Sequence, residues 1–212
     1  MFLSLQSAII ALMVITYDGV ESIKITQGDL TVALNPISKD SKIKGTSFGS
    51  DIVMISANHP DLNGSESATR KDREPFVIKG PGEYEVMGIK VRGIVLEKES
   101  DAKNIRTVYL VKMDGLQLCF LGSIEKDLDE GFLEKIGEVD VLFIDGEADA
   151  KKIISLIKDA DPRIVICYSD ENAKMLMKEF GQTVEAQDKV SVKKKDLSEE
   201  ETKLIWLKEK EK

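Results

Sequence analysis

The sequence predicts an α/β fold in which two β-sheets pack face to face and helices lie outside them, a four-layer αββα sandwich. The first half of the 212 residues consists of short apolar or alternating runs separated by Gly, Pro, Asn and Asp, a pattern typical of strands and turns. The second half alternates apolar strand-like runs with segments of helical period. With 42% hydrophobic and 32% charged residues, the chain has enough apolar material for a core.

Strands in the first half are expected wherever an apolar or alternating run is bounded by turn residues. In chain order, these runs are residues 14–17, 22–26, 30–34, 51–56, 76–78, 84–86 and 89–94. The pair Asp18-Gly19 suits a tight turn between the first two strands. The runs 107–112 and 116–121, joined by Met113-Asp114-Gly115, predict a hairpin.

Helices are expected only in the second half. Apolar residues recur at helical spacing at Leu128, Phe132, Leu133 and Ile136. Asp149 can cap a second helix, whose apolar face carries Ile153, Ile154, Leu156 and Ile157. A third helix is expected over residues 171–180, with Gly181 placed to end it. The remaining strands are expected at residues 139–144, 164–167, 190–192 and 204–207.

The chain is expected to form a single domain over residues 14–207, with an appended segment at 1–13 and a charged tail at 208–212. The apolar run 8–16 is far shorter than the roughly 20 residues that a membrane span needs. The first residues also lack the basic region of a signal peptide. We therefore expect a cytoplasmic protein that does not associate with membranes.

The charge and the rarest residue types exclude several functions. A net charge of −8 argues against nucleic acid as a partner. His59 is the single histidine, so a Ser-His-Asp or Cys-His nucleophile would have to use it. Zinc enzymes usually use about three protein ligands, so a metal site here would depend largely on carboxylates. The two cysteines, Cys119 and Cys167, lie in apolar runs and are expected to be buried thiols of a reducing compartment.

Seven segments, taken in order, match a known family: residues 51–63, 80–86, 91–94, 114–123, 137–142, 162–166 and 195–202. Through them, nearly everything after Val14 resembles the metallo-β-lactamase fold. Within that fold, the chain is most similar to the small bacterial and archaeal Zn-dependent hydrolases related to the ascorbate-6-phosphate lactonases. The resemblance implies a two-metal site near the carboxyl ends of the strands.

The metal-binding motif of that family is only partly present. The family's His-x-His-x-Asp-His loop corresponds to residues 57–62, where the outer two histidines are Ala57 and Leu62. The resemblance implies that His59 would serve one metal and Asp61 the other, so each half of the site keeps one ligand. The family's metal-bridging aspartate in a Leu-Gly-Asp turn corresponds to Ser123.

Other ligand positions of the family are also altered. They correspond to Val20, to Asn35, to a position near Lys126 and to the stretch Tyr168-Ser169-Asp170. Without a metal ion, no bound water is brought to a pKa of about 7. We therefore expect no cofactor and a catalytically inactive relative, a pseudoenzyme, with a binding or assembly role. The residues expected to line its pocket are Asn58, Ser123, Lys126, Tyr168 and Ser169.

Three alternatives stay open. His59 and Asp61 could hold one Zn or Mn ion and hydrolyse a phosphoester or lactone, or they could be ordinary loop residues. Lys126 with Ser123 could hold an anion, or Lys126 could be a solvated charge. An oxygen-ligand cation site could also be rebuilt from the carboxylates that follow the later strands, Glu125, Asp145, Glu147 and Asp170. The partner is then an unknown small molecule or protein, and a homo-oligomer is expected by analogy with the lactonase relatives.

Overall fold

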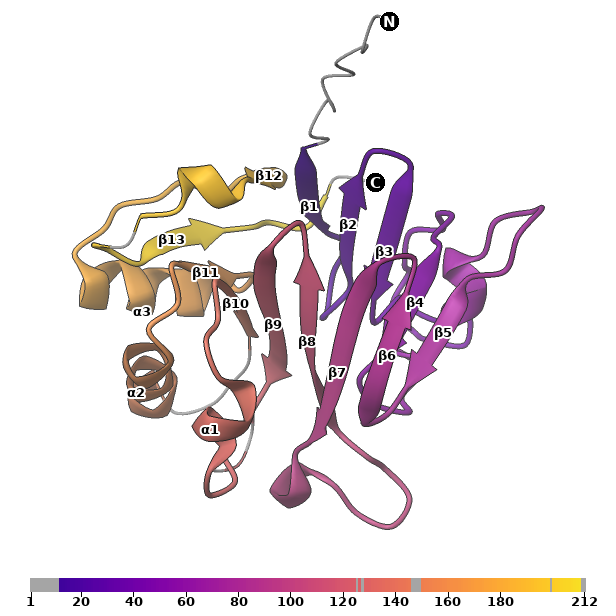
Figure 1. Cartoon of the computed structure of the whole chain (residues 1–212), viewed down its shortest axis with the longest axis horizontal. Helices are drawn as coiled ribbons and strands as arrows, with labels where there is room; N and C mark the ends of the chain where they lie inside the picture. The colour runs from indigo at the N-terminus through magenta and orange to yellow at the C-terminus, as the bar shows by residue number, and fades with distance from the viewer. Residues whose placement is uncertain (1–11, 125, 127, 146–149, 199, 211–212) are drawn as a thin grey trace, which may run out of the picture.

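The computed structural model describes residues 12–124, 126, 128–145, 150–198 and 200–210, and its strands form two sheets that pack against each other (Figure 1). One sheet has six strands in the order β12-β1-β2-β3-β4-β5, and the other has seven in the order β13-β11-β10-β9-β8-β7-β6. The expected α/β sandwich of two packed sheets is confirmed, with the α-helices of the described residues on the seven-stranded sheet. Every strand expected from the sequence overlaps a strand of the structure.

The six-stranded sheet is antiparallel on one side and parallel on the other. Strands β12, β1, β2 and β3 pair antiparallel, and β3, β4 and β5 pair parallel. On β1 and β2, buried residues alternate with partly exposed ones, because only one face of each strand meets the other sheet. The bounds are β1 Met13–Tyr17, β2 Ile23–Gln27, β3 Leu30–Leu34, β4 Ile52–Ile55, β5 Phe76–Lys79 and β12 Lys189–Val192.

The seven-stranded sheet begins with a meander and continues with parallel strands. Strands β6 to β9 pair antiparallel, whereas β9, β10, β11 and β13 pair parallel. The expected hairpin joins β8 to β9, and both Asp114 and Gly115 have positive φ, as a tight two-residue turn requires. The bounds are β6 Gly82–Val86, β7 Ile89–Val95, β8 Thr107–Met113, β9 Leu116–Ser123, β10 Val141–Asp145, β11 Ile164–Cys167 and β13 Lys203–Trp206.

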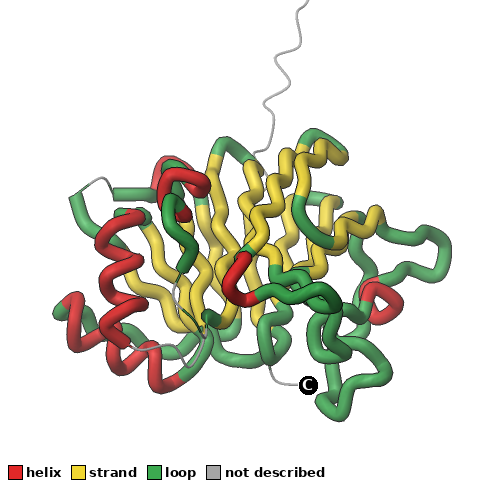
Figure 2. Tube along the Cα trace, turned by 90° about the horizontal axis from the view of Figure 1, so that it is seen from below, coloured by secondary structure: helices red, strands yellow, loops and turns green. Residues whose placement is uncertain are grey.

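The α-helices all cover the outer face of the seven-stranded sheet, and they gather on one flank in Figure 2. They are α1 Phe132–Ile136, α2 Ala150–Ala160 and α3 Asp170–Phe180. The outer face of β3, β4 and β5 is covered by loops, where Ala68 and Phe48 pack on Ala33, Val53 and Ile55. Three short 3-10 helices complete the fold: η1 Ser65–Ala68, η2 Glu97–Glu99 and η3 Lys194–Asp196.

Two apolar layers hold these elements together. The larger lies between the sheets and includes Ile15, Ile52, Tyr109 and Phe143. The second lies between the seven-stranded sheet and the helices, and both cysteines are buried as expected, Cys119 and Cys167 each being 0% exposed. None of the helices in the described part of the chain has the length and apolar character needed to cross a membrane.

The helices and the C-terminal residues differ in detail from what the sequence predicts. The helical spacing that starts at Leu128 gives a helix only from Phe132, because Gly131 has a φ of +71°, which interrupts a right-handed helix. Gly181 ends α3 in the left-handed conformation, as expected, whereas Asp149 lies outside the described residues. At residues 208–210 of the expected tail, the side chains are exposed, but the Lys210 N–H donates a hydrogen bond to the Tyr17 carbonyl at 3.0 Å.

Candidate functional site

The ends of several strands converge at one edge of the sandwich. Ser123 at the end of β9 and Asp145 at the end of β10 are paired in register. Ser56 follows β4, and Glu21 lies in the turn after β1. Arg106 directly precedes β8 and reaches three of these segments. The edge therefore gathers polar side chains from both sheets.

A buried ion pair between Arg106 and Glu21 occupies the centre of this edge. The two side chains are only 13% and 8% exposed. The Arg106 Nη2 donates to Glu21 Oε1 at 2.6 Å and to Oε2 at 2.8 Å. The same guanidinium donates to Ser56 Oγ at 3.3 Å and to the Ser123 carbonyl at 3.4 Å. A charged pair held by this many hydrogen bonds fixes the two sheets relative to each other.

The remaining acceptor positions of Glu21 are also used. Asn35 Nδ2 donates to Oε2 at 3.2 Å, and the Ser123 N–H donates to Oε1 at 3.1 Å. Asn35 in turn accepts the Ser56 N–H at 2.8 Å. A Cβ on Gly122 would lie 2.5 Å from Arg106 Nη2 and 2.6 Å from Glu21 Oε2, so only glycine leaves room for the pair.

Little free space remains beside the ion pair. A cavity of about 10 Å³ is lined by Glu21, Asn35, Ser56, Gly122 and Tyr168, together with apolar residues of the core. This volume is at the lower limit for a single water molecule. The centre of the edge is therefore filled by protein atoms.

A larger cavity of about 600 Å³ lies next to the pair. Its lining includes Tyr17, Ser123, Asp145, Ser169 and Glu171, which come from β1, β9, β10 and the start of α3. The Tyr17 ring stacks on Tyr168, with ring centroids 4.7 Å apart. Burial raises the pKa of both phenols, and the carboxylate of Asp145 raises it further.

The surviving motif residues His59 and Asp61 lie in a separate loop. The His59 side chain is 63% exposed, and its Nδ1 is 3.5 Å from Asp61 Oδ2. Asp61 Oδ1 accepts a hydrogen bond from Ser41 Oγ at 2.5 Å. Asn58, also exposed, accepts from Asn63 Nδ2 at 2.9 Å. Within the described residues, no hydrogen bond or ion pair links His59 or Asp61 to the ion pair or the larger cavity.

The expected pocket residues are thus only partly brought together. Ser123 and Ser169 line the larger cavity, and Tyr168 is buried next to it. Lys126 instead points toward η2, where its Nζ donates to the Lys98 carbonyl at 2.6 Å and its backbone N–H donates to Glu99. The positive charge of Lys126 therefore lies away from the cavity.

The described residues do not fit a divalent metal ion. Among them, no three His, Cys, Asp or Glu side chains are grouped as a metal would require. Asp145 accepts a hydrogen bond from Asn172 Nδ2 at 3.2 Å, and Asp170 is exposed. Glu125 and Glu147, the other carboxylates considered for an oxygen-ligand site, lie outside the described residues.

Glu21 and Arg106, the two charged residues at the centre of the site, were not identified from the sequence. Glu21 directly follows Val20, which the family resemblance places at a ligand position, and this neighbourhood could have identified Glu21 as a site residue. Arg106 is one of 30 basic residues and directly precedes an apolar strand, so nothing in the sequence distinguishes it from a solvated charge.

The relatives of this chain are shown by a family model, the β-lactamase superfamily domain, which matches residues 14–168. The chain belongs to the β-lactamase superfamily. The match ends at Tyr168, so it includes the strand ends that carry the ion pair. A search of curated proteins found no match.

Solved structures of other proteins share this fold. A protein from Thermotoga maritima, assigned to the Zn-dependent hydrolases of the metallo-β-lactamase superfamily, is 21% identical with a TM-score of 0.73, covering 92% of this chain and 98% of its own. A metallo hydrolase from the archaeon Ignicoccus hospitalis is 13% identical with a TM-score of 0.62, covering 86% and 99%. At these identities the likeness establishes the fold alone.

Proposed function

We propose that this superfamily member works without a metal ion and acts by binding, because an internal ion pair has taken the central place at the strand ends. The observation that carries the proposal is the Arg106–Glu21 pair, which is buried and hydrogen-bonded to residues at the ends of three different strands, β3, β4 and β9. Ser123, at the position of the family's bridging aspartate, contributes only its backbone to this pair.

The chemistry of a guanidinium supports this proposal. Hydrolases of this kind use Zn²⁺ or a similar ion to turn bound water into a nucleophile at neutral pH. A guanidinium also supplies positive charge, but it offers only N–H donors and has no open coordination position. Here those donors are directed at Glu21, Ser56 and Ser123. The positive charge therefore serves the fold and not the activation of water.

Metal retention tests the proposal directly. The full chain is loaded with Zn²⁺ or Mn²⁺, desalted, and analysed for bound metal, alongside the variants His59→Ala and Asp61→Ala. We expect no stoichiometric metal in any of the three proteins, and an unfolding midpoint that EDTA leaves unchanged.

The opposite outcome would establish the hydrolase alternative. Retention of about one metal ion per chain, lost in both variants, would show that His59 and Asp61 form a metal site. Metal-dependent turnover of a phosphoester or lactone, abolished by the same two substitutions, would give the same answer. The 3.5 Å approach of His59 to Asp61 makes these two residues the right pair to change.

A further inference from the structure

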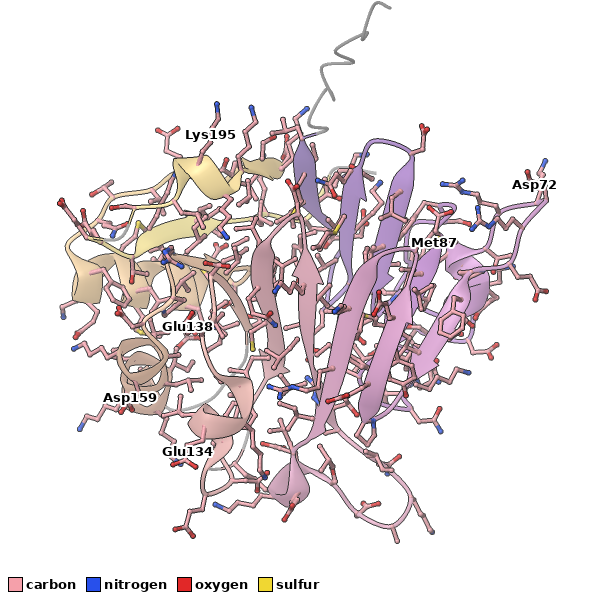
Figure 3. All side chains as sticks on the ribbon, viewed as in Figure 1. Asp72, Met87, Glu134, Glu138, Asp159 and Lys195 are labelled. Carbon is pink, nitrogen blue, oxygen red and sulfur yellow. The ribbon has the colours of Figure 1, made fainter. Side chains whose placement is uncertain are left out.

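We propose that two copies of this chain associate through an apolar patch at the rim where β5 and β6 meet. The patch consists of Phe76, Tyr84, Val86 and Met87, and we call it the rim patch. It lies at the flank away from the α-helices (Figure 1), and Figure 3 shows Met87 at the turn that follows β6. The association does not depend on whether the strand ends hold a metal ion.

The two strands that form the rim are tied together at both ends. β5 and β6 are outermost strands, one in each sheet, and only Gly80 and Pro81 separate them in the chain. At their other ends, the Nη2 of Arg73, just before β5, donates to the Sδ of Met87 at 3.6 Å. Because the chain reverses between the strands, Phe76 at the start of β5 and Met87 after β6 lie at the same end of the rim.

The apolar layer between the sheets is open at this rim. Tyr84 and Val86 of β6 pack against that layer, and Ile78 of β5 is part of it. Phe76 is two residues before Ile78 and therefore on the same face of β5. Ile78 is fully buried, whereas Phe76 is 49% and Met87 52% exposed. An exposed apolar patch with a polar border is typical of a contact between proteins.

The borders of the rim patch carry opposite charges. Lys79 is exposed at the end of β5, and Glu83 is exposed near the start of β6. Arg92 is the cross-strand neighbour of Glu83, but its guanidinium donates to a carbonyl of α1. The patch therefore has a basic border on β5 and an acidic border on β6.

These borders make the rim patch complementary to itself, so the partner that it fits is a second copy. A two-fold axis along the strands sets β5 of each copy against β6 of the other. Lys79 then faces Glu83 of the second copy, and Phe76 faces Met87 of the second copy. Opposite charges meet at one end of the contact and apolar groups at the other. Elsewhere the net charge of −8 keeps two copies apart.

Light scattering of the full chain at about 1 to 100 µM tests the association, since interfaces of modest size bind in this range or more tightly. The mass is expected to rise to twice the 23.6 kDa of the single chain. Phe76→Asp is expected to raise the dissociation constant about tenfold or more, because it places a charge in an apolar contact. Ile105→Asp is the matched control: Ile105 is also 49% exposed, but it lies in the loop between η2 and β8.

A pair of charge reversals tests the geometry of the contact. Lys79→Glu and Glu83→Lys are each expected to weaken self-association, because each sets like charges against one another. When the two variants are mixed, both contacts of a heterodimer again join opposite charges. Native mass spectrometry of the mixture is therefore expected to show the heterodimer in excess of either homodimer. Circular dichroism checks that each variant is folded.

Three results would overturn the inference: a single-chain mass over the whole concentration range, equal weakening by Phe76→Asp and Ile105→Asp, or no preference for the heterodimer. A chain that dimerises only after residues 1–11 are removed would also overturn it, because that segment would then be the occupant of the rim patch. Metal retention is measured on the same samples. A monomer without metal refutes only the association, whereas a dimer with stoichiometric metal refutes only the proposed function.

Discussion

Removing Arg106 is expected to destabilise the protein far more than removing an exposed lysine that makes an equally short ion pair. Arg106→Ala leaves the carboxylate of Glu21, which is 8% exposed, without its charged partner. Breaking a buried pair from one side costs about 3–5 kcal/mol. For a chain of this size, that corresponds to a fall in Tm of roughly 6–20 °C. Urea unfolding followed through the fluorescence of Trp206, the single tryptophan, measures the change.

The Lys158–Glu179 pair provides the control, because its N–O distance is also 2.6 Å but its side chains are 58% and 35% exposed. Lys158→Ala is expected to lower the free energy of unfolding by less than about 1 kcal/mol. The double variant Glu21→Gln, Arg106→Met removes both charges. Its loss in the free energy of unfolding should be smaller, by about 2–3 kcal/mol, than the sum of the losses in the single variants Glu21→Gln and Arg106→Met. If Arg106→Ala and Lys158→Ala cost the same, the ion pair does not hold the sheets together and the argument built on it is wrong.

Three further predictions concern the glycine beside the ion pair and the two buried thiols of the core. Gly122→Ala is expected to lower the free energy of unfolding by about 2–4 kcal/mol, because the added methyl group clashes with the ion pair at a residue whose φ is +69°. Gly181→Ala serves as the control: its φ is +64° but the space around it is open, so the loss should be about 1–2 kcal/mol. Equal losses in urea unfolding would contradict the clash. Burial raises the pKa of Cys119 and Cys167 to about 12, so neither thiol should react with iodoacetamide at pH 8 until urea unfolds the chain. The thiols have a higher pKa in the folded protein than in the unfolded chain, so between about pH 9 and 12 they ionise only when the chain unfolds. Their contribution should therefore lower the free energy of unfolding as the pH rises through this range, and urea unfolding at several pH values measures the change.

The fold could be predicted from the sequence because its signals are local. Alternation on β1 and β2, the Asp114-Gly115 turn and Gly181 after α3 each act within a few residues, and the structure follows all of them. Leu128 shows where prediction from local spacing fails. Its spacing fits the helix, but the backbone at Gly131 adopts a left-handed conformation and delays the start to Phe132. Periodicity alone does not show which glycine interrupts a helix.

The site was harder to predict because its interactions are long-range. Arg106 and Glu21 are 85 residues apart, and only the pairing of the strands brings them together. The motif residues His59 and Asp61 were found by their likeness to a family pattern, yet they contact each other and Ser41 and do not contact the ion pair. A motif records where ligands lie in relatives. Whether a charge is buried with a partner depends on the whole sheet.

Under the proposed function, the ion pair supplies the positive charge at the strand ends that a metal ion would otherwise supply. The stabilisation that a bound metal gives depends on the concentration of free metal, and its carboxylate ligands repel one another when it leaves. Arg106 is part of the chain, so its charge is present at any metal concentration. The buried ion pair requires three features together: a carboxylate at Glu21, a guanidinium at Arg106 and the absence of a side chain at Gly122. Because each is unfavourable without the others, their joint presence supports the proposed function without a metal ion.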